Sequence, residues 1–352
     1  MLQNEIKESF IELGRFLKQF SNENYIKNET VKNNTLFHDD FIQLIELSQS
    51  HNGWFTKDNV CFSIASLANA LTKENLDKWL SSYNFSAVKQ KNVGLILAGN
   101  IPLVGFHDFL SVLISGHKVV IKTSSSDQHL IEFLAKYLIS LDNRLKEKIT
   151  FAEGKLENFD AVIATGSNNT ARYFEYYFKE KPSIIRKNRN SVAILTGKET
   201  KEDLIPLGED IFRYFGLGCR NVSKIFIPKD YNFDNFFNAI FEYQEIIKYE
   251  KYANNYDYNK AVYLMSNYKL LDNGFLTLKE DNSYSSPISS LFYEYYDNLD
   301  ELEKKLQNDV EKIQCIVGKD SFLKSINFGQ TQLPNLWDYA DNIDTIEFLV
   351  TL

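Results

Sequence analysis

The sequence of 352 residues has few cysteines and no long apolar run, and both absences limit its class. Its cysteines, Cys61, Cys219 and Cys315, are odd in number and widely separated, which indicates a reducing, cytoplasmic compartment. No uninterrupted apolar stretch reaches the ~18 residues of a membrane span. The first twenty residues place apolar side chains among charges and lack the continuous apolar core of a signal peptide. We therefore expect no membrane span and no secretion signal.

An excess of positive charge is also absent. The formal net charge is −8 at pH 7, which argues against a nucleic-acid-binding surface, because neutralising phosphates requires a basic face. The sequence contains neither G-x-G-x-x-G nor G-x-x-x-x-G-K-[ST], so a dinucleotide, if any, must be held differently. The histidines show no H-E-x-x-H and the cysteines no C-x-x-C, so we expect no metal site.

What is present is an alternation of short apolar runs with helical patterns, beginning near Asn92. The runs "NVGLILAG", "HKVVIKTS", "ITFAEG" and "DAVIATG" are typical of buried strands, and helix-like segments such as "FHDFLSVLIS" separate them. Continuous apolar strands with intervening helices predict a mostly parallel sheet that is covered on both faces. We therefore expect a Rossmann-like α/β domain here.

A second αβ series runs from "SVAILTG" to "KIQCIVG". Between the two series, "KPSIIRKNRN" carries four positive charges and little periodicity, so we expect the domain boundary there. The predicted organisation is N-terminal helices with a cofactor domain over 1–190, a catalytic domain over 191–330 and a tail over 331–352. The Asn- and Tyr-rich segment 248–286 has weak periodicity and is predicted to be a surface excursion.

Strand ends carry the first candidate site residues. Thr165, Gly166 and Ser167 end one strand and open a helix, so backbone N–H groups there would face a pyrophosphate. The alternative is an ordinary turn in which Ser167 or Asn168 caps the helix. Asn100 follows another strand, where open α/β sheets bind ligands, although alone it is typical of a turn residue.

Cys219 differs from the other two cysteines in its setting. It lies in "GLGCRN", a Gly-flanked loop that gives the backbone freedom and the thiol access. Cys61 and Cys315 lie in apolar runs, where cysteines behave as small hydrophobes. Context alone leaves two interpretations of Cys219 open, a nucleophile and an incidental thiol.

Taken together and in order, these segments resemble the aldehyde dehydrogenase superfamily, and most closely its LuxC-like acyl-CoA reductase branch. The resemblance is carried by "VGLILAGNIPLVGFHDFLSVLISGHKVVIKTSSSD", "FDAVIATGSNNTARYF" and "FGLGCRNVSKIFIP", and by the ending "FGQTQLPNLWDYADNIDTIEFL". It implies an aldehyde-dehydrogenase-like fold, with a Rossmann-like cofactor domain and an α/β catalytic domain.

The resemblance also implies roles for individual residues. Cys219 corresponds to the family's nucleophile, and Asn100 to the amide that forms an oxyanion hole with the Cys219 backbone N–H. Lys122 corresponds to the lysine at the adenosine ribose. Gly166 and Ser167 correspond to the block that faces the cofactor phosphates.

One departure from the family's pattern bears on the reaction. Hydrolytic aldehyde dehydrogenases carry a water-activating glutamate ahead of a strand, and here Arg186 stands near that place. The implied reaction is therefore acyl-CoA reduction, in which hydride resolves a thioester on Cys219 and an aldehyde leaves. The alternatives are a hydrolytic NAD(P)-dependent aldehyde dehydrogenase and a non-catalytic protein that retains the fold and binds a nucleotide or an acyl chain.

A further departure concerns the nicotinamide ribose. The family's Glu-x-Phe-Gly-Pro segment reads "SYSSPISSLF" here, so only Pro287 is recognisable. Ser285 and Ser286 are weak substitutes for the missing glutamate.

The residues after Lys122 bear on cofactor choice. Many NAD-preferring relatives have a glutamate that repels a 2′-phosphate, and this sequence has Ser125 at that position, after Thr123 and Ser124. We therefore expect NADPH, with NADH as the alternative, because a serine hydroxyl can donate to a phosphate oxygen. The other interpretation is that Ser125 only caps the next helix.

Superfamily members usually dimerise through strands. Here the candidate strands lie near "IDTIEFLVTL" and "YNFSAVKQK", which are alternating or apolar enough to pair as edges. The sequence therefore predicts a homodimer.

Overall fold

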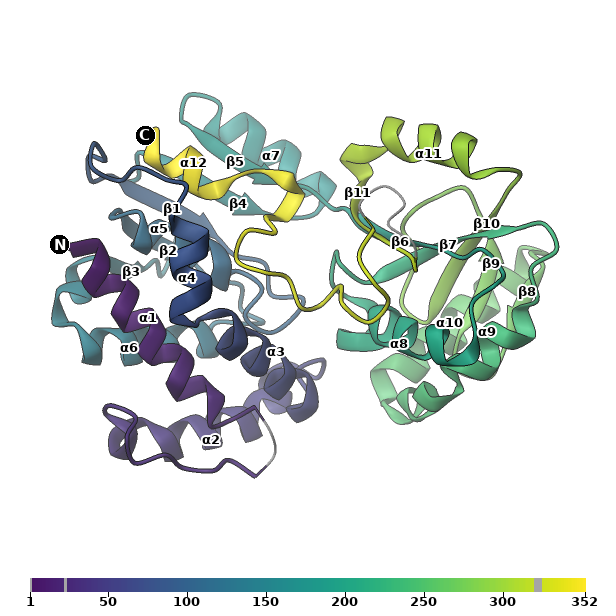
Figure 1. The fold of residues 1–352 in the computed structure, drawn as a ribbon, viewed down its shortest axis with the longest axis horizontal. Coiled ribbons are helices and arrows are strands. Elements are labelled where there is room, and N and C mark those ends of the chain that lie inside the picture. The colour runs from purple at the N-terminus through teal and green to yellow at the C-terminus, as the bar shows by residue number, and fades with distance from the viewer. Residues whose placement is uncertain (1, 22–23, 320–324) are drawn as a thin grey trace. The chain divides into compact units, whose positions relative to one another are not determined.

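The computed structural model describes residues 2–21, 24–319 and 325–352, and the chain forms two compact units (Figure 1). The first unit comprises Met1–Lys187 and Asn335–Leu352, and the second comprises Asn188–Pro334. Each unit has its own sheet with helices around it, which confirms the predicted α/β class. Within the described ranges, no helix is both long enough and apolar enough to span a bilayer.

The first unit is built on a five-stranded parallel sheet in the order β3-β2-β1-β4-β5. Its strands are β1 (Asn92–Ile96), β2 (Lys118–Lys122), β3 (Ile149–Phe151), β4 (Ala161–Thr165) and β5 (Ser183–Arg186). Ile96 at the end of β1 is in register with Lys122 of β2 and with Ala164 of β4. Because all these strands are parallel, the loops that follow β1, β2 and β4 leave the sheet at the same edge.

Helices cover this sheet and supply most of the first unit's core. They are α1 (Leu2–Lys18), α2 (Asn34–His51), α3 (Lys57–Ala70), α4 (Lys73–Leu80), α5 (Phe106–Ile114), α6 (His129–Leu141), α7 (Asn168–Phe178) and α12 (Thr345–Val350), with the 3₁₀ turns η1 (Asn143–Glu147) and η6 (Ala340–Asn342). The apolar stripe of α1 is buried against α5, where the ring of Phe10 packs edge-on against those of Phe106 and Phe109. Threonine caps begin α3 and α4, since Thr56 and Thr72 each accept a backbone N–H of the first turn.

The C-terminal segment returns to the first unit, and the strand predicted there is wrong. Residues 345–350 form α12, which packs on α5 with Ile346 and Leu349 fully buried. His117 Nε2 lies 2.8 Å from the Leu349 carbonyl oxygen, and His107 Nε2 lies 2.8 Å from that of Leu336. The other segment predicted to pair, residues 83–91, forms turns and irregular structure. Ile346 and Leu349, three residues apart, therefore lie on one face of a helix and belong to the core of the first unit.

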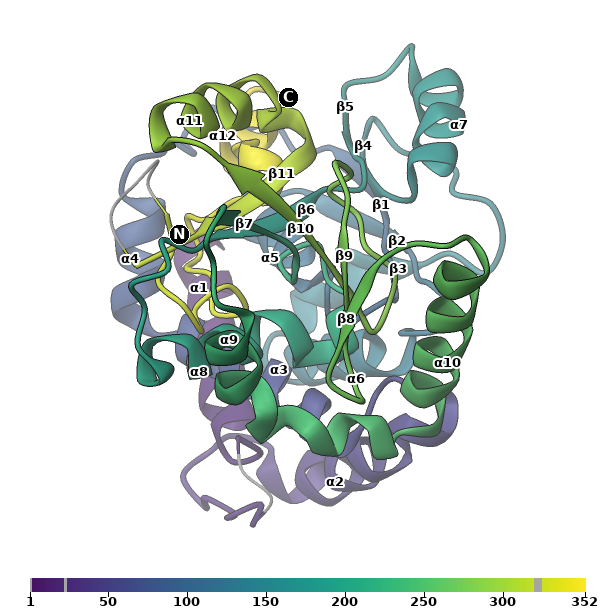
Figure 2. The same cartoon turned by 90° about the vertical axis from the view of Figure 1, so that its right-hand side faces the viewer.

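The second unit is built on a six-stranded sheet in the order β11-β6-β7-β10-β9-β8. Its elements are β6 (Asn190–Ile194), α8 (Lys201–Phe212), η2 (Arg213–Gly216), β7 (Val222–Pro228), α9 (Phe233–Ile240), η3 (Phe241–Lys248), α10 (Glu250–Met265), β8 (Leu270–Asp272), β9 (Thr277–Glu280), β10 (Ser290–Tyr296), α11 (Leu299–Asn308), η4 (Val310–Lys312) and β11 (Ile313–Val317). Only the β8–β9 pair is antiparallel among these strands of the described chain. In Figures 1 and 2, α11 lies on one face of this sheet and α8 and α9 lie on the other.

The segment 248–286, predicted to be a surface excursion, is instead part of this unit's framework. It forms α10, β8 and β9, and Tyr252 and Tyr256 of α10 are buried. Tyr252 donates a hydrogen bond to the Phe275 carbonyl oxygen at 3.0 Å, and Tyr256 donates to the Asp272 carboxylate at 2.7 Å. These tyrosines, four residues apart on one helix face, fasten α10 to the β8–β9 hairpin.

Candidate active site

The loops that carry Asn100 and the serines after Lys122 touch each other. The Leu97 N–H donates to the Lys122 carbonyl oxygen at 3.0 Å, which extends the strand pairing into both loops. A methyl group added at Gly99 would lie 2.6 Å from Ser124 Oγ, so a glycine is needed where the loops meet. The structure thereby brings the exposed side chain of Asn100 to the same edge as Lys122 and Ser124.

Asp127 joins these two loops, and the sequence did not reveal it as a site residue. Leu103, three residues past Asn100, has a left-handed backbone with φ of 58°, and its N–H donates to Asp127 Oδ2 at 2.7 Å. Ser63 of α3 holds the same loop, because its hydroxyl donates to the Pro102 carbonyl oxygen at 2.9 Å. Burial raises the pKa of Asp127 to about 8. The hydrogen bond from the Leu103 N–H lowers this pKa, but burial has the larger effect. A buried carboxyl therefore determines the path of the Asn100 loop.

Ser125 does not cap the next helix. Helix α6 begins at His129, its N-cap residue is Gln128, and no side-chain capping bond is made there. Ser125 is exposed in the loop, while Ser124 Oγ accepts the Ser126 N–H at 3.2 Å. The exposed hydroxyl of Ser125 is thus available to a ligand at this edge.

The turn between β4 and α7 shows the predicted helix cap. Ser167 is the N-cap residue, and its Oγ accepts the Thr170 N–H at 3.2 Å. At Gly166, an added methyl group would lie 3.0 Å from Thr170 Cβ and 3.1 Å from the Phe174 ring. A cap satisfies one of the four N-terminal N–H groups of a helix, so the cap and a phosphate seat are compatible.

These residues fit the phosphate and ribose half of a nicotinamide dinucleotide. Lys122 ends β2 and is followed by a loop with several hydroxyls, of which that of Ser125 is exposed. A helix N-terminus follows β4, two positions away in the sheet at the same edge. Open α/β sheets bind ligands outside the carboxyl ends of their strands, where such donors converge. The dinucleotide assignment of Lys122, Ser124, Ser125, Thr165, Gly166 and Ser167 stays a prediction.

Cys219 lies in the second unit, in the loop between η2 and β7. Its side chain is exposed, whereas Cys61 and Cys315 are buried, as their apolar settings predicted. Ser191 at the start of β6 is fully buried, and its hydroxyl donates to the Cys219 carbonyl oxygen at 3.0 Å. The neighbouring strand thus holds the backbone of the Cys219 loop, in which Cys219 itself is exposed.

Arg186, near the place of the family's water-activating glutamate, is a buried structural residue of the first unit. Its guanidinium pairs with Asp108 of α5, with Nη2 2.7 Å from Oδ1 and Nε 3.3 Å from Oδ2. Nη1 donates to the Ala340 carbonyl oxygen at 2.7 Å, and Nη2 also donates to Thr345 Oγ1 at 3.0 Å. The side chain therefore binds β5 to α5 and to the C-terminal segment and supplies no base for water.

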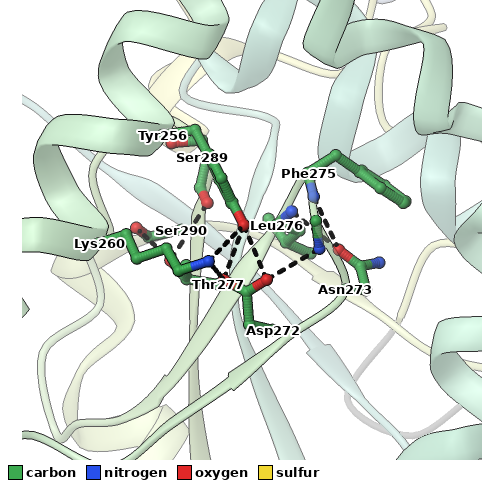
Figure 3. Close-up of polar contacts among 10 residues, drawn as sticks. Tyr256, Lys260, Asp272, Asn273, Phe275, Leu276, Thr277, Ser289 and Ser290 are labelled. Carbon is green, nitrogen blue, oxygen red and sulfur yellow. Dashed lines mark hydrogen bonds and ion pairs between the residues drawn. The ribbon is translucent and has the colours of Figure 1, made fainter. Parts of the chain in front are cut away.

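The loop before β10 carries the two serines that could substitute for the missing glutamate. Ser286 Oγ donates to the Ser290 carbonyl oxygen at 2.7 Å, whereas the Ser285 side chain is exposed. Figure 3 shows how the β9 residue Thr277 holds this loop: its N–H donates to the Ser289 carbonyl oxygen at 3.0 Å, and its hydroxyl lies 3.0 Å from Ser290 Oγ. Of the two candidates, Ser285 is exposed, whereas the Ser286 hydroxyl is used within the loop.

Comparison with known families and curated proteins gives matches of one kind. The family described as acyl-CoA reductase (LuxC) matches residues 6–247, a range that contains every candidate residue except those before β10. A long-chain acyl-protein thioester reductase of Aliivibrio fischeri is 24% identical over 227 residues, which cover 58% of this chain and 47% of that protein. One from Photobacterium phosphoreum is 25% identical over 185 residues, covering 47% of this chain and 38% of that protein. The matched part is thus less than half the length of either curated relative.

Solved structures with a similar fold are aldehyde dehydrogenases. Aldehyde dehydrogenase 21 of Physcomitrella patens, in complex with the reaction product succinate, has a TM-score of 0.67 at 11% identity. The match covers 97% of this chain and 84% of that chain. A mutant of the indole-3-acetaldehyde dehydrogenase AldA of P. syringae, in complex with NAD+ and IAA, has a TM-score of 0.64 at 14% identity. This match covers 95% of this chain and 75% of that chain. At such low identity these likenesses establish the fold alone, and they confirm the predicted aldehyde-dehydrogenase-like class.

Proposed function

The chain belongs to the LuxC acyl-CoA reductase family, and on that premise we propose that it reduces a fatty acyl thioester to the aldehyde with a reduced nicotinamide cofactor. The observation that carries the proposal is the exposed thiol of Cys219, which lies within the matched range and in the block that resembles the family's nucleophile. We propose acyl-CoA as the acyl donor. The curated relatives are acyl-protein thioester reductases by name, so an acyl-protein is the second donor to test.

The proposed reaction has two halves. The Cys219 thiolate attacks the thioester carbonyl carbon, a C–S bond to Cys219 forms, and the bond to CoA breaks as CoA leaves as a thiolate and takes up a proton. Lys122, Ser125 and the turn at Gly166 and Ser167 would hold a reduced nicotinamide cofactor, which would supply the hydride that this carbon takes up. The bond between the carbon and Cys219 sulfur then breaks, which releases the aldehyde and returns the thiolate. Asn100 and the Cys219 backbone N–H are the proposed donors to the oxyanion in both halves.

The buried ion pair of Arg186 argues against the hydrolytic alternative. Releasing an acid would require a base to activate water against the thioester on Cys219. Arg186 stands near the place of the family's glutamate, cannot act as a base, and is bonded to Asp108, Ala340 and Thr345. Resolution of the thioester by hydride needs no such base.

We further propose NADPH as the preferred cofactor. Lys122 and the exposed hydroxyl of Ser125 would hold a 2′-phosphate, because neither residue repels it and both can donate hydrogen bonds. Ser124, Thr165, Gly166 and Ser167 complete the proposed binding edge. NADH is the alternative, and the cytoplasmic location predicted from the sequence also belongs to this proposal. The predicted homodimer belongs to it as well, but through surfaces other than the two expected strands, since residues 83–91 are irregular and residues 345–350 form α12.

Acyl transfer without reductant tests the nucleophile. Incubation with a long-chain acyl-CoA should load one acyl group per chain, and intact-mass and peptide analysis should place it on Cys219. Cys219→Ala should abolish loading, whereas Cys61→Ser and Cys315→Ser, which alter buried thiols, should retain it.

A second arm replaces acyl-CoA by an acylated carrier protein with the same chain. Loading from the carrier alone would show that the donor is an acyl-protein. Full loading of Cys219→Ala from either donor would refute the nucleophile, and aldehyde formation by that variant would refute the whole scheme. A wild-type chain that binds acyl-CoA and transfers nothing would favour the non-catalytic alternative.

A further inference from the structure

The backbone just ahead of Cys219 contains three consecutive left-handed residues. The φ angles are 54° at Tyr214, 59° at Phe215 and 76° at Gly216. A glycine adopts this conformation readily, but two bulky aromatic residues in succession do so only under constraint. Strained backbone of this kind persists where the surroundings hold it, and it is concentrated at active sites and switches.

Asn221 holds the turn from both of its ends. Its Oδ1 accepts the Gly218 N–H at 2.8 Å, and its Nδ2 donates to the carbonyl oxygens of Arg213 at 2.8 Å and Asp210 at 3.0 Å. Only 2% of Asn221 is exposed, so water does not compete for these bonds. The Asn221 amide thereby joins Arg213, which precedes the three left-handed residues, to Gly218, which precedes Cys219.

The partners of Asn221 are themselves anchored. The Asp210 carboxylate is fully buried and accepts the N–H groups of Gly329 at 2.6 Å and Thr331 at 3.0 Å. The Phe215 ring packs against that of Tyr249, the residue directly before α10, with ring centroids 5.0 Å apart. Asn221 therefore connects the Cys219 loop to residues that make further contacts within the second unit.

From this geometry, and resting on the proposed function, we propose that Asn221 is the positioning residue of the nucleophile. Its amide keeps the turn at 214–216 left-handed and so fixes the direction in which the Cys219 thiol leaves the loop. Asn221 touches no reacting atom in this scheme. Both halves of the amide are needed, because the acceptor holds Gly218 and the donor holds Arg213 and Asp210.

Two variants separate the acceptor from the donor. Asn221→Ala removes both, and Asn221→Asp keeps the oxygen for Gly218 but places a second oxygen against two carbonyl groups. That oxygen can donate only when the carboxyl is protonated, and burial favours the protonated form. Tyr256→Phe is the matched control, because it also removes side-chain hydrogen bonds of the second unit, those of the Tyr256 hydroxyl with Asp272 and Lys260 shown in Figure 3.

Single-turnover acylation of Cys219 by acyl-CoA is the first readout. Asn221→Ala should slow acylation by about 10²-fold, the scale on which misplaced reacting groups lose rate, with KM within threefold of wild type. Asn221→Asp, even if Asn221→Ala fails to fold, should approach the wild-type rate as pH falls from 8 to 6. Tyr256→Phe should keep the wild-type rate per folded molecule. A wild-type rate in Asn221→Ala, or a pH-independent ratio of Asn221→Asp to wild type, overturns the proposal.

Alkylation of Cys219 by iodoacetamide is the second readout and needs no acyl substrate. Peptide mapping should show a rate at Cys219 that differs at least threefold between Asn221→Asp at pH 8 and wild type. If wild type accepts no acyl group but this difference is seen, the positioning role stands and the proposed function fails. If the alkylation rates coincide, the positioning role is overturned whatever the protein reduces.

Discussion

Replacing Arg186 by methionine removes a buried cation from the first unit and leaves its partner behind. Arg186 is 5% exposed and Asp108 is 8% exposed, so neither charge is solvated to a useful extent. Methionine fills a similar volume, but it offers nothing to the Asp108 carboxylate, the Ala340 carbonyl or the Thr345 hydroxyl. The substitution therefore tests whether this position is structural, as the geometry indicates.

The expected cost follows from the class of interaction. Removing one partner of a buried ion pair costs about 3–5 kcal/mol, because the remaining charge is left buried without compensation. At a slope of about 2 kcal/mol per molar urea, a loss of 4 kcal/mol lowers the unfolding midpoint by about 2 M. The three tryptophans, Trp54, Trp79 and Trp337, all lie in the first unit, so tryptophan fluorescence in urea reports on this unit alone.

Two variants serve as controls for Arg186→Met. Arg144→Met breaks pairs with Glu5 and Asp142 in the same unit, but Arg144 is 54% exposed, so its loss should shift the unfolding midpoint far less than Arg186→Met does. Adding Asp108→Asn to Arg186→Met should recover part of the loss, since the stranded charge is then gone. A loss below about 1 kcal/mol in Arg186→Met would refute the reasoning.

Three further predictions concern the site and pH. Asn100→Ala should lower kcat by about 10²–10³ without unfolding the protein, and a loss under threefold would leave Asn100 as a turn residue only. Ser125→Glu should shift the ratio of kcat/KM for NADPH over NADH toward NADH, and an unchanged ratio removes Ser125 as the determinant. Burial lowers the pKa of His117, whose Nε2 bonds to Leu349 and whose Nδ1 accepts the Lys91 N–H. The folded unit thus binds fewer protons than the unfolded chain, so its free energy of unfolding should fall as pH drops below about 6.5. The fall should be smaller in His117→Gln. Urea unfolding midpoints of both proteins at pH 7.5 and 5.5 would show the difference.

The sequence predicted the parts of the fold that follow from unbroken apolar runs. The segments that became β1, β2, β4, β6 and β7 carry such runs, and their alternation with helical patterns fixed the α/β class. The strand β5 was missed because Ser183–Arg186 is only four residues long, contains an arginine and follows a proline. Helix α12 was missed because six residues allow either period, and only the fit of Ile346 and Leu349 against α5 decides between them.

The candidate site divides in the same way. Asn100, Cys219 and the residues after β2 and β4 could be found from the sequence, because they lie at strand ends or in a glycine-flanked loop and match a family's blocks in order. Asp127 and Asn221 could not, since each acts on a backbone group that only the folded chain brings near. The available signal was local: Asn221 directly precedes β7, and Asp127 lies within a run of polar residues after β2.

The two loops with the proposed catalytic side chains share one physical device. In each, an apolar residue is left-handed, Leu103 in the one loop and Phe215 in the other, and a buried polar side chain accepts an N–H group of the loop. Asp127 and Asn221 are buried and hold the backbone of these loops, while Asn100 and Cys219 are exposed on them. An exposed side chain is surrounded by few packing neighbours, so the conformation of its backbone bears directly on its orientation. A backbone in an unfavourable conformation persists where its surroundings hold it, and buried hydrogen bonds hold it without competition from water.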